Sequence, residues 1–579
     1  MKFATAMLLP AVLAAAGPAV AASENLHPGK GAKTALPAPV ATQTRIAASD
    51  TDFSSCDGYA APKGKTDGIS RENFFFGATR SADIRRSEIY SIGESGLAAC
   101  DRTLADPRLV DDFWLRRANL MQAKALHSIA AKQPEQALVL VAESNALGTA
   151  HDERYFVQSI GVGNEGVLAY ALIALGRRDE AKAAIERLRR SRPWAQSIQQ
   201  LATRLQLHLD SGFAGQAAEL KGAIPLSPEK AEALFWMEFL YGNYAEARDI
   251  APSISFDLPK QRGGWTLRGA DEAALKAIGS RNSFYGAWAY AETVAGHDDR
   301  SHSLLAEANK ELDEIMVPPP PRSDGRPPKK QDVEDYRRRE PHAVKARDEL
   351  ALWKAAIAFR PMIALKPVDV TEVEFSRKRL NTLPIMPDVL ANLPQQSAAE
   401  KAEVDGVMAN IRNRLEEERI TALDLPVDEL LPLLPRPETP KVVPTLKPAG
   451  DGSFLSDSGL TRNREGSSDV WTIRYTHRLA PMAAVEELAM LGAAQSAQQA
   501  GFDSLLLLGR LSISRTTNVV GWTTGSYNSG YEAQMRVRFV NANALPEDLG
   551  GAAWRLIPAQ RVIDDLGNRY RPGGLTIAW

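Results

Sequence analysis

The sequence predicts a mainly helical protein that ends in a small α+β domain. Apolar residues recur at spacings of three and four from residue 84 to about residue 316, which is the period of an amphipathic helix. Proline or glycine interrupts this pattern every 15 to 20 residues and divides it into short helices. After residue 468, apolar and polar residues alternate instead, as in strands.

The chain is long and carries little net charge. Its 579 residues are 44% apolar and 24% charged, with a formal net charge of -2. This length suggests about three or four domain-sized units. The charge balance gives no electrostatic reason to expect a nucleic acid, so we expect no nucleic-acid partner.

The first 22 residues have the pattern of a secretory signal peptide. Lys2 is followed by an apolar stretch over residues 3–16 and by small residues, so that cleavage is expected near Ala21 or Ala22. No later apolar run approaches the roughly 20 residues that a membrane-spanning helix needs. The sequence therefore predicts an exported, soluble, periplasmic protein with no transmembrane segment.

Cys56 and Cys100 are the only cysteines in the chain. Export to an oxidising compartment favours a disulfide between them, and two buried free thiols are the alternative. In the chain-entropy view, closing this loop stabilises the fold by roughly 3–4 kcal/mol. Two cysteines without a C-x-x-C spacing exclude a cysteine-based zinc site and a thioredoxin-type redox motif.

The remaining elements follow in chain order. A flexible lead-in is expected after the signal peptide, because Ala, Pro, Gly, Ser and Thr dominate there without periodicity. The helical region is divided by two proline-rich segments, and the C-terminal domain should contain strands at 469–475, 502–511 and 531–540 and a helix at 483–500. The predicted units are a lead-in (23–83), a helical hairpin array (84–316), a Pro-rich loop (317–331), a helical continuation (332–423), a Pro-rich linker (424–467) and a small α+β domain (468–579).

Gly161, Gly163 and Gly166 have the G-x-G-x-x-G spacing of a dinucleotide-binding turn. That fold also needs a second parallel strand that ends in an acidic residue about 20 residues further on. Glu186 stands at this distance but lies within a helical pattern, and no strand pattern follows before Pro193. We therefore expect no cofactor, with the first two glycines forming the break before a helix and Gly166 in its first turn.

A helical-hairpin pattern accounts better for the same stretch. Ala169, Gly176, Ala181 and Pro193 have the spacings of the small, turn, small and terminal-proline positions of a tetratricopeptide (TPR) repeat. Partial copies of the pattern contain Ala125 and Ala137, Gly212 and Ala217, Gly242 and Ala247, and Ala289 and Gly296. Lys132 replaces the turn glycine in the first copy, and Ser301 replaces the second small residue in the last.

The chain thus resembles the TPR family, with degenerate repeats. The second small positions are separated by 44, 36, 30 and 54 residues, and only the middle two approach the family period of about 34. The resemblance implies an α-solenoid of antiparallel helical hairpins, which presents a groove to a protein or peptide partner.

Other candidate sites are weaker. No histidine pair has the i, i+4 spacing of a zinc protease, and "HDDRSH" at 297–302 is interpreted as a solvated turn. The arginines between 187 and 192 are interpreted as a solvated helix end. Trp522 and Tyr527, in a Gly/Ser-rich stretch at 521–530, form either a mobile loop or a binding loop for sugar or peptide. We identify no catalytic residue and no metal ligand.

The most consistent function is a non-enzymatic one. We expect an exported scaffold that binds a protein or peptide partner and serves in cell-envelope assembly. The alternatives are a lytic enzyme acting on an envelope polymer through one glutamate in a helical cleft, and a carbohydrate-binding module. A deep cleft with a buried acid of raised pKa would favour the enzyme.

Overall fold

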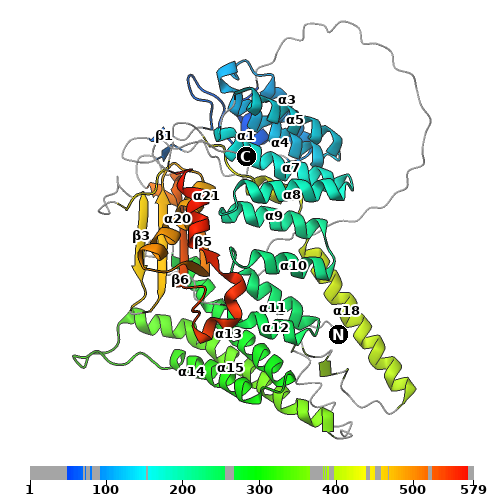
Figure 1. The fold of residues 1–579 in the computed structure, drawn as a ribbon, viewed down its shortest axis with the longest axis vertical. Coiled ribbons are helices and arrows are strands. Elements are labelled where there is room, and N and C mark those ends of the chain that lie inside the picture. Colours follow the sequence, from blue (N-terminus) through cyan, green and yellow to red (C-terminus); the bar gives the residue numbers. More distant parts are fainter. Residues whose placement is uncertain are drawn as a thin grey trace.

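The computed structural model describes residues 48–69, 72–73, 79–80, 92–151, 154–254, 267–365, 383, 385, 388–389, 391, 397–438, 444–449, 458–466, 468–519 and 525–570. The protein is mainly helical and carries a small antiparallel five-stranded sheet near its C-terminal end, as predicted. The expected signal peptide and Trp522 lie outside the described residues. Figure 1 shows the helices following one another along one side of the molecule, with the sheet lying beside them.

Most successive helices of the long helical region pack against one another. They are α3 (Glu94–Leu104), α4 (Trp114–Ala130), α5 (Pro134–His151), α6 (Arg154–Gln158), α7 (Ile160–Ala174), α8 (Arg178–Ser191), α9 (Gln196–Leu209), α10 (Phe213–Ala223), α11 (Lys230–Leu240), α12 (Tyr244–Ile250), α13 (Leu267–Val294), α14 (Asp298–Ile315) and α15 (Lys330–Leu365). We call this stretch the helical array.

Four hairpins of the array share one turn geometry. In α4–α5, α7–α8, α11–α12 and α13–α14 the turn residue has a positive φ: 60° at Lys132, 70° at Gly176, and 80° at Gly242 and Gly296. In the second hairpin, the Gly176 amide donates to Ile173 O and the next amide donates to Leu172 O, and the other three turns repeat this pair of bonds. Glycine favours such a turn because a left-handed backbone strains other residues.

The small residues of the pattern lie where paired helices meet. The side chains at the position five residues after the turn are fully buried in all four hairpins, at Ala137, Ala181, Ala247 and Ser301. Ala125, Ala169 and Ala289, seven residues before their turns, are also fully buried. A methyl group or hydroxyl at these points lets two helix backbones approach closely.

The hairpin α9–α10 departs from the predicted pattern. Gly212 has a φ of -68° and forms the N-cap of α10, so it is not a left-handed turn residue. Ala217 is only partly buried. The chain instead bends through an extended residue at the end of α9, Asp210, whose carboxylate accepts the Gly212 amide. Pro193 lies, as expected, between α8 and α9.

The glycines of the G-x-G-x-x-G stretch lie within a helix. The expected break at Gly161 and Gly163 is wrong, because α7 begins at Ile160 and includes all three glycines. A Cβ atom at Gly163 would lie 2.6 Å from Nε2 of Gln122, on the neighbouring helix α4. A side chain at Gly163 would displace the Gln122 amide, which donates to Ile160 O and to Oδ1 of Asn164.

The C-terminal module is an antiparallel sheet with one long helix on its inner face. Its strands lie in the order β3-β4-β6-β5-β7, and the apolar face of β4, β5 and β6 packs on α20. The elements are β3 (Gly459–Arg464), β4 (Val470–His477), α20 (Met482–Gln499), β5 (Ser504–Val519), β6 (Gly525–Val540), the 3-10 helix η4 (Glu547–Arg555), β7 (Ile557–Pro558) and α21 (Ala559–Gly567). The loop predicted at 521–530 is shorter, because β6 begins at Gly525.

Two segments predicted as irregular contain helices. The lead-in includes α1 (Asp50–Asp57), which packs against α3 and α4 around the fully buried Phe53. It also includes two short paired strands, β1 (Glu72–Asn73) and β2 (Thr79–Arg80). The Pro-rich linker includes α19 (Val427–Leu433), which follows the long helix α18 (Ala398–Ala422). Tertiary packing orders these segments although their local sequence has little helical periodicity.

Candidate polypeptide-binding face

The first helices of successive hairpins, α4, α7, α9 and α11, carry a second polypeptide segment on their surface. This segment comprises residues 416–438, from the last turns of α18 through α19, and we call it the internal segment. Glu416 lies at Tyr241 just after α11, Leu425 at α7, and α19 contacts α4. The internal segment therefore crosses these helices in the reverse of their chain order.

Four leucines of the internal segment are buried in the core of the array. Leu425, Leu430, Leu431 and Leu434 are between 0% and 5% exposed and belong to the same apolar cluster as Ala125, Ala169 and Ala181. Burial of a leucine side chain contributes about 1.5–3 kcal/mol. Leu434 also lies over Gly166 of α7, where a Cβ would be in ordinary van der Waals contact with its Cδ2 at 3.6 Å.

Polar contacts fix the register of the internal segment. The Tyr170 hydroxyl donates to Leu425 O at 2.5 Å, and Nδ1 of His208 lies 3.3 Å from Leu423 O. Arg204 pairs with Glu429. Burial, together with Asp424 and Asp428, raises the pKa of Tyr170 to about 12, so the hydroxyl stays protonated and able to donate near neutral pH.

Further contacts anchor the α18 end of the segment. Arg419 donates to Oε1 of Gln216 at 2.7 Å, and the Tyr241 hydroxyl donates to Oε2 of Glu416 at 2.7 Å. The face thus supplies apolar surface for leucines, and arginine, histidine and tyrosine side chains for carbonyl and carboxylate oxygens. It holds a leucine-rich and acidic stretch of chain that is helical at the end of α18 and again in α19.

The internal segment ends at a buried ionic cluster that joins the array to the C-terminal module. Arg192, which caps α8, donates to both carboxylate oxygens of Glu487 on α20 at 3.1 and 2.8 Å, and to Oε1 of Glu438 at 2.5 Å. Glu487 also accepts from Arg569 at 2.8 Å and from the Tyr570 hydroxyl at 2.5 Å. The side chains of Arg192 and Glu487 are 1% and 0% exposed.

The two glutamates of this cluster differ in pKa. Burial alone would raise the pKa of Glu487, but Arg192 and Arg569 lower it to about 2. Burial raises the pKa of Glu438 above its ordinary value, although Arg192 opposes this shift. Burial, reinforced by the charge of Glu487, also raises the pKa of Tyr570.

Two carboxylates with separated pKa values are the arrangement that general acid–base catalysis requires. Here, however, both accept hydrogen bonds from one guanidinium group, and the side chain of Glu438 is only 10% exposed. The positive charges of Arg192 and Arg569 balance the two carboxylates. We therefore assign the cluster to holding the array, the internal segment and the C-terminal module together.

Other contacts between the array and the module involve the links between successive hairpins. Oε2 of Glu486 accepts from the amide and hydroxyl of Ser197 at 2.9 and 2.7 Å. Arg510 donates to Trp194 O at 2.8 Å, and Arg555 donates to Ser253 O at 2.9 Å. The four left-handed turns, by contrast, are exposed to solvent. The module is therefore docked on one edge of the array.

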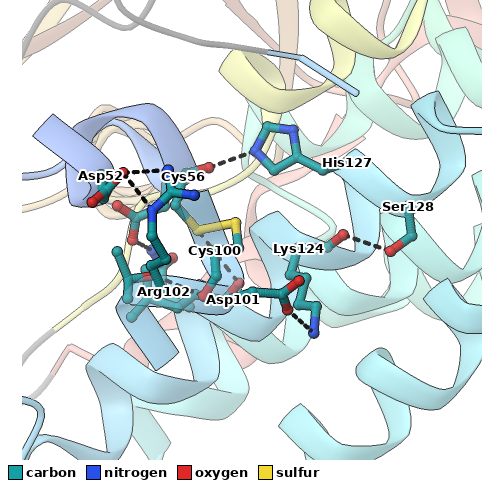
Figure 2. The surroundings of a disulfide bond; sticks show 12 residues. Asp52, Cys56, Cys100, Asp101, Arg102, Lys124, His127 and Ser128 are labelled. Atoms are coloured by element: carbon teal, nitrogen blue, oxygen red, sulfur yellow. Dashed lines mark hydrogen bonds and ion pairs between the residues drawn. A yellow bond between two sulfur atoms is a disulfide. The ribbon is translucent and has the colours of Figure 1, made fainter. Parts of the chain in front are cut away.

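The predicted disulfide is present and lies at the N-terminal end of the array. Cys56 on α1 is bonded to Cys100 on α3, and both residues are fully buried (Figure 2). Nε2 of His127, on α4, lies 2.7 Å from Cys56 O. Nδ1 of this fully buried histidine has no hydrogen-bond partner among the described residues. The disulfide fastens α1 to the array.

The predicted binding loop is described only in part. Tyr527 lies in β6 opposite Thr517, so its assignment to a loop is wrong, and Trp522 lies outside the described residues. The "HDDRSH" stretch is solvated as predicted, except at the buried Ser301, but it is not a turn: α14 begins at Asp298, and only His297 precedes it. No group of histidine, cysteine and acidic side chains suited to a metal ion occurs in the described part of the chain.

Sequence reasoning missed Arg192 and the internal segment. The charge pattern places Arg192 with the exposed arginines of α8, although its position next to Pro193 and Trp194, beyond the helix end, distinguishes it. In "LDLPVDELLPLLPRPE" at 423–438 the leucines between the prolines are unusually dense for a linker. That density was the available signal of a bound segment.

The fold and this face define a mainly helical protein that holds a polypeptide segment on its helices. Comparisons with known protein families, characterised proteins and solved structures give no match to the chain. Among the described helices, none combines the length and the apolar character needed to cross a membrane.

Proposed function

We propose that the protein is an exported protein-interaction scaffold of the cell envelope. Its TPR-like hairpins form an α-solenoid, and the first helices of those hairpins make a face that binds a leucine-rich polypeptide segment. The observation that carries this proposal is the internal segment itself, seated on that face through four buried leucines and a series of polar contacts. Stacked hairpins offer an extended binding surface of this kind.

The C-terminal module gives the scaffold a second surface. It is docked on the links between hairpins, so the outer faces of the second helices remain available to a partner in trans. Exposed residues are frequent on α5, α8 and α14, which supports this arrangement.

Binding by the helical face can be tested with a labelled synthetic peptide of residues 423–438. The full mature chain carrying Leu430→Ala and Leu431→Ala should hold its internal segment less tightly and bind the peptide saturably. The unmodified chain should bind it at least tenfold more weakly. Leu488→Ala, in the core of the C-terminal module, is the matched control. If the double variant keeps its helical circular dichroism but shows no saturable binding, the face does not bind polypeptide in this way.

One observation favours the rival enzyme, namely that Glu438 is buried and has a raised pKa. Cross-linking of the mature protein in its own envelope separates the two functions. Recovery of one stoichiometric protein partner supports the scaffold. Glycan cleavage that Glu438→Gln abolishes, without a protein partner, supports the lytic enzyme instead.

A further inference from the structure

The link between α14 and α15 is longer than is needed to connect two adjacent helices. These two helices pack against each other, and links between adjacent antiparallel helices usually need about 2–8 residues. Here fourteen residues, 316–329, separate Ile315 from Lys330. We call them the proline spur, and in Figure 1 they extend away from the body of the molecule beside α14.

Local chemistry makes the proline spur stiff. Six of its residues are prolines, four of them consecutive at 318–321 and two at 327–328. Proline fixes its own φ and pushes the preceding residue towards an extended conformation. Residues 317–320 and 326–327 each precede a proline, so both arms are held near the polyproline II conformation, which has no internal hydrogen bonds.

The tip and the base of the proline spur are both fixed. Arg322 N donates to Arg326 O at 2.9 Å, and Gly325 N donates to Arg322 O at 2.9 Å, so the two arms are joined by a tight turn. Gly325 has a φ of 77°, which this turn requires. At the base, the Tyr336 hydroxyl donates to Met316 O at 3.4 Å.

Only the base of the proline spur packs against the array, through the partly buried Met316. All residues from 320 to 327 are exposed, and Val317 keeps 64% of its surface exposed. A stiff, ordered arm whose residues 320–327 contribute no burial within the chain is accounted for by contact with another molecule. A preformed polyproline II segment loses little conformational entropy when an aromatic-lined groove binds it.

The net positive charge of the proline spur is too small to account for such a contact by itself. The proline spur contains three basic residues, Arg322, Arg326 and Lys329, and one acid, Asp324, which pairs with Arg326. Electrostatic binding to an anionic surface usually needs clusters of about four to eight basic residues. The prolines are therefore the dominant recognition feature, and Arg322 adds a flanking charge.

We infer that the proline spur is a recognition arm for a partner protein with an aromatic-lined, polyproline-binding groove that carries acidic residues at its edge. This site lies outside the helical face of the proposed function. The peptide-binding test of that face and the test below can therefore fail independently.

The test is photo-cross-linking in the protein's own envelope, with a benzophenone amino acid in place of Ser323 in the full chain. The expected result is an adduct with one protein, mapped to a surface that contains tryptophan or tyrosine. Pro319→Ala with Pro320→Ala should reduce its yield at least tenfold, and Arg322→Gln about two- to fivefold. The probe placed at Arg178, an exposed residue at the start of α8, is the matched control and should give no such adduct.

Several results would overturn the inference. They are an adduct with lipid or glycan, an undiminished yield in the double proline variant, or no adduct at all. Unchanged helical circular dichroism of the double proline variant would show that a reduced yield does not arise from misfolding.

Discussion

Replacement of Arg192 by methionine tests whether the buried cluster holds the array to the C-terminal module. The change keeps a long apolar side chain but removes the charge that both Glu487 and Glu438 contact. Glu487 retains Arg569, whereas Glu438 loses the only ion-pair partner recorded for it within the described residues. Breaking one partner out of a buried pair costs about 3–5 kcal/mol, because an uncompensated charge stays buried. We expect Arg192→Met to lower the free energy of unfolding by this amount.

Urea denaturation followed by circular dichroism measures this loss. Two further variants identify its cause. Adding Glu438→Gln to Arg192→Met should restore about 1 kcal/mol or more, since the unpaired carboxylate is then removed. Arg177→Met, at the opposite end of α8, removes an exposed arginine paired with Glu180 and should leave stability unchanged.

The pH dependence of Arg192→Met provides a second readout. Without Arg192 the pKa of Glu438 in the folded chain should lie further above its unfolded value, so the folded state binds more protons. Stability should then rise as the pH falls from 7 towards 5. A loss below about 1 kcal/mol, or a stability that is independent of pH over this range, would refute the assignment of the cluster as a clamp.

Three further predictions concern the array. Lys132→Gly should raise the free energy of unfolding by about 1 kcal/mol, and Gly176→Lys should lower it by about the same, because both positions have a left-handed backbone. Urea titration should therefore show the unfolding midpoints of the two variants shifted in opposite directions. Thiol titration of the denatured, unreduced protein should find no free thiol. Cys56→Ser with Cys100→Ser should lower the free energy of unfolding by about 4 kcal/mol, the chain-entropy value for a 44-residue separation. Burial lowers the pKa of His127, so the unfolded chain binds more protons than the folded chain below about pH 6.5. The free energy of unfolding should therefore decline as the pH falls through this value. This pH dependence should vanish in His127→Gln.

The sequence predicted those elements whose signals are local. Three- and four-residue spacing identified the helices of the array, and turn chemistry located the left-handed turns at Gly176, Gly242 and Gly296. It failed at Gly212, where an aspartate two residues earlier provides a different bend. The substitution of lysine for glycine at position 132 did not prevent the same turn, because the surrounding hairpin imposes it.

Local sequence patterns did not predict most of the candidate site. Residues 424–467 have the proline content of a linker, and only the packing of Leu430 and Leu431 on distant helices orders the α19 region. The burial of Arg192 depends on Glu487, which lies 295 residues away in the sequence. Contacts of such separation leave no periodic signal within either segment.

The position of the internal segment also sets an order of events during synthesis. Tyr170 and Leu425 are separated by 255 residues. At roughly 5–20 residues per second, the ribosome needs about 13–50 s to make the intervening chain. Throughout this interval the leucine-binding surface of α7 and α9 is not covered by the internal segment. A contact between residues so far apart in the sequence also forms slowly once both have been synthesised. Nascent chains that stop before residue 423 should therefore aggregate or remain bound to chaperones, whereas chains that extend beyond residue 438 can close their own core.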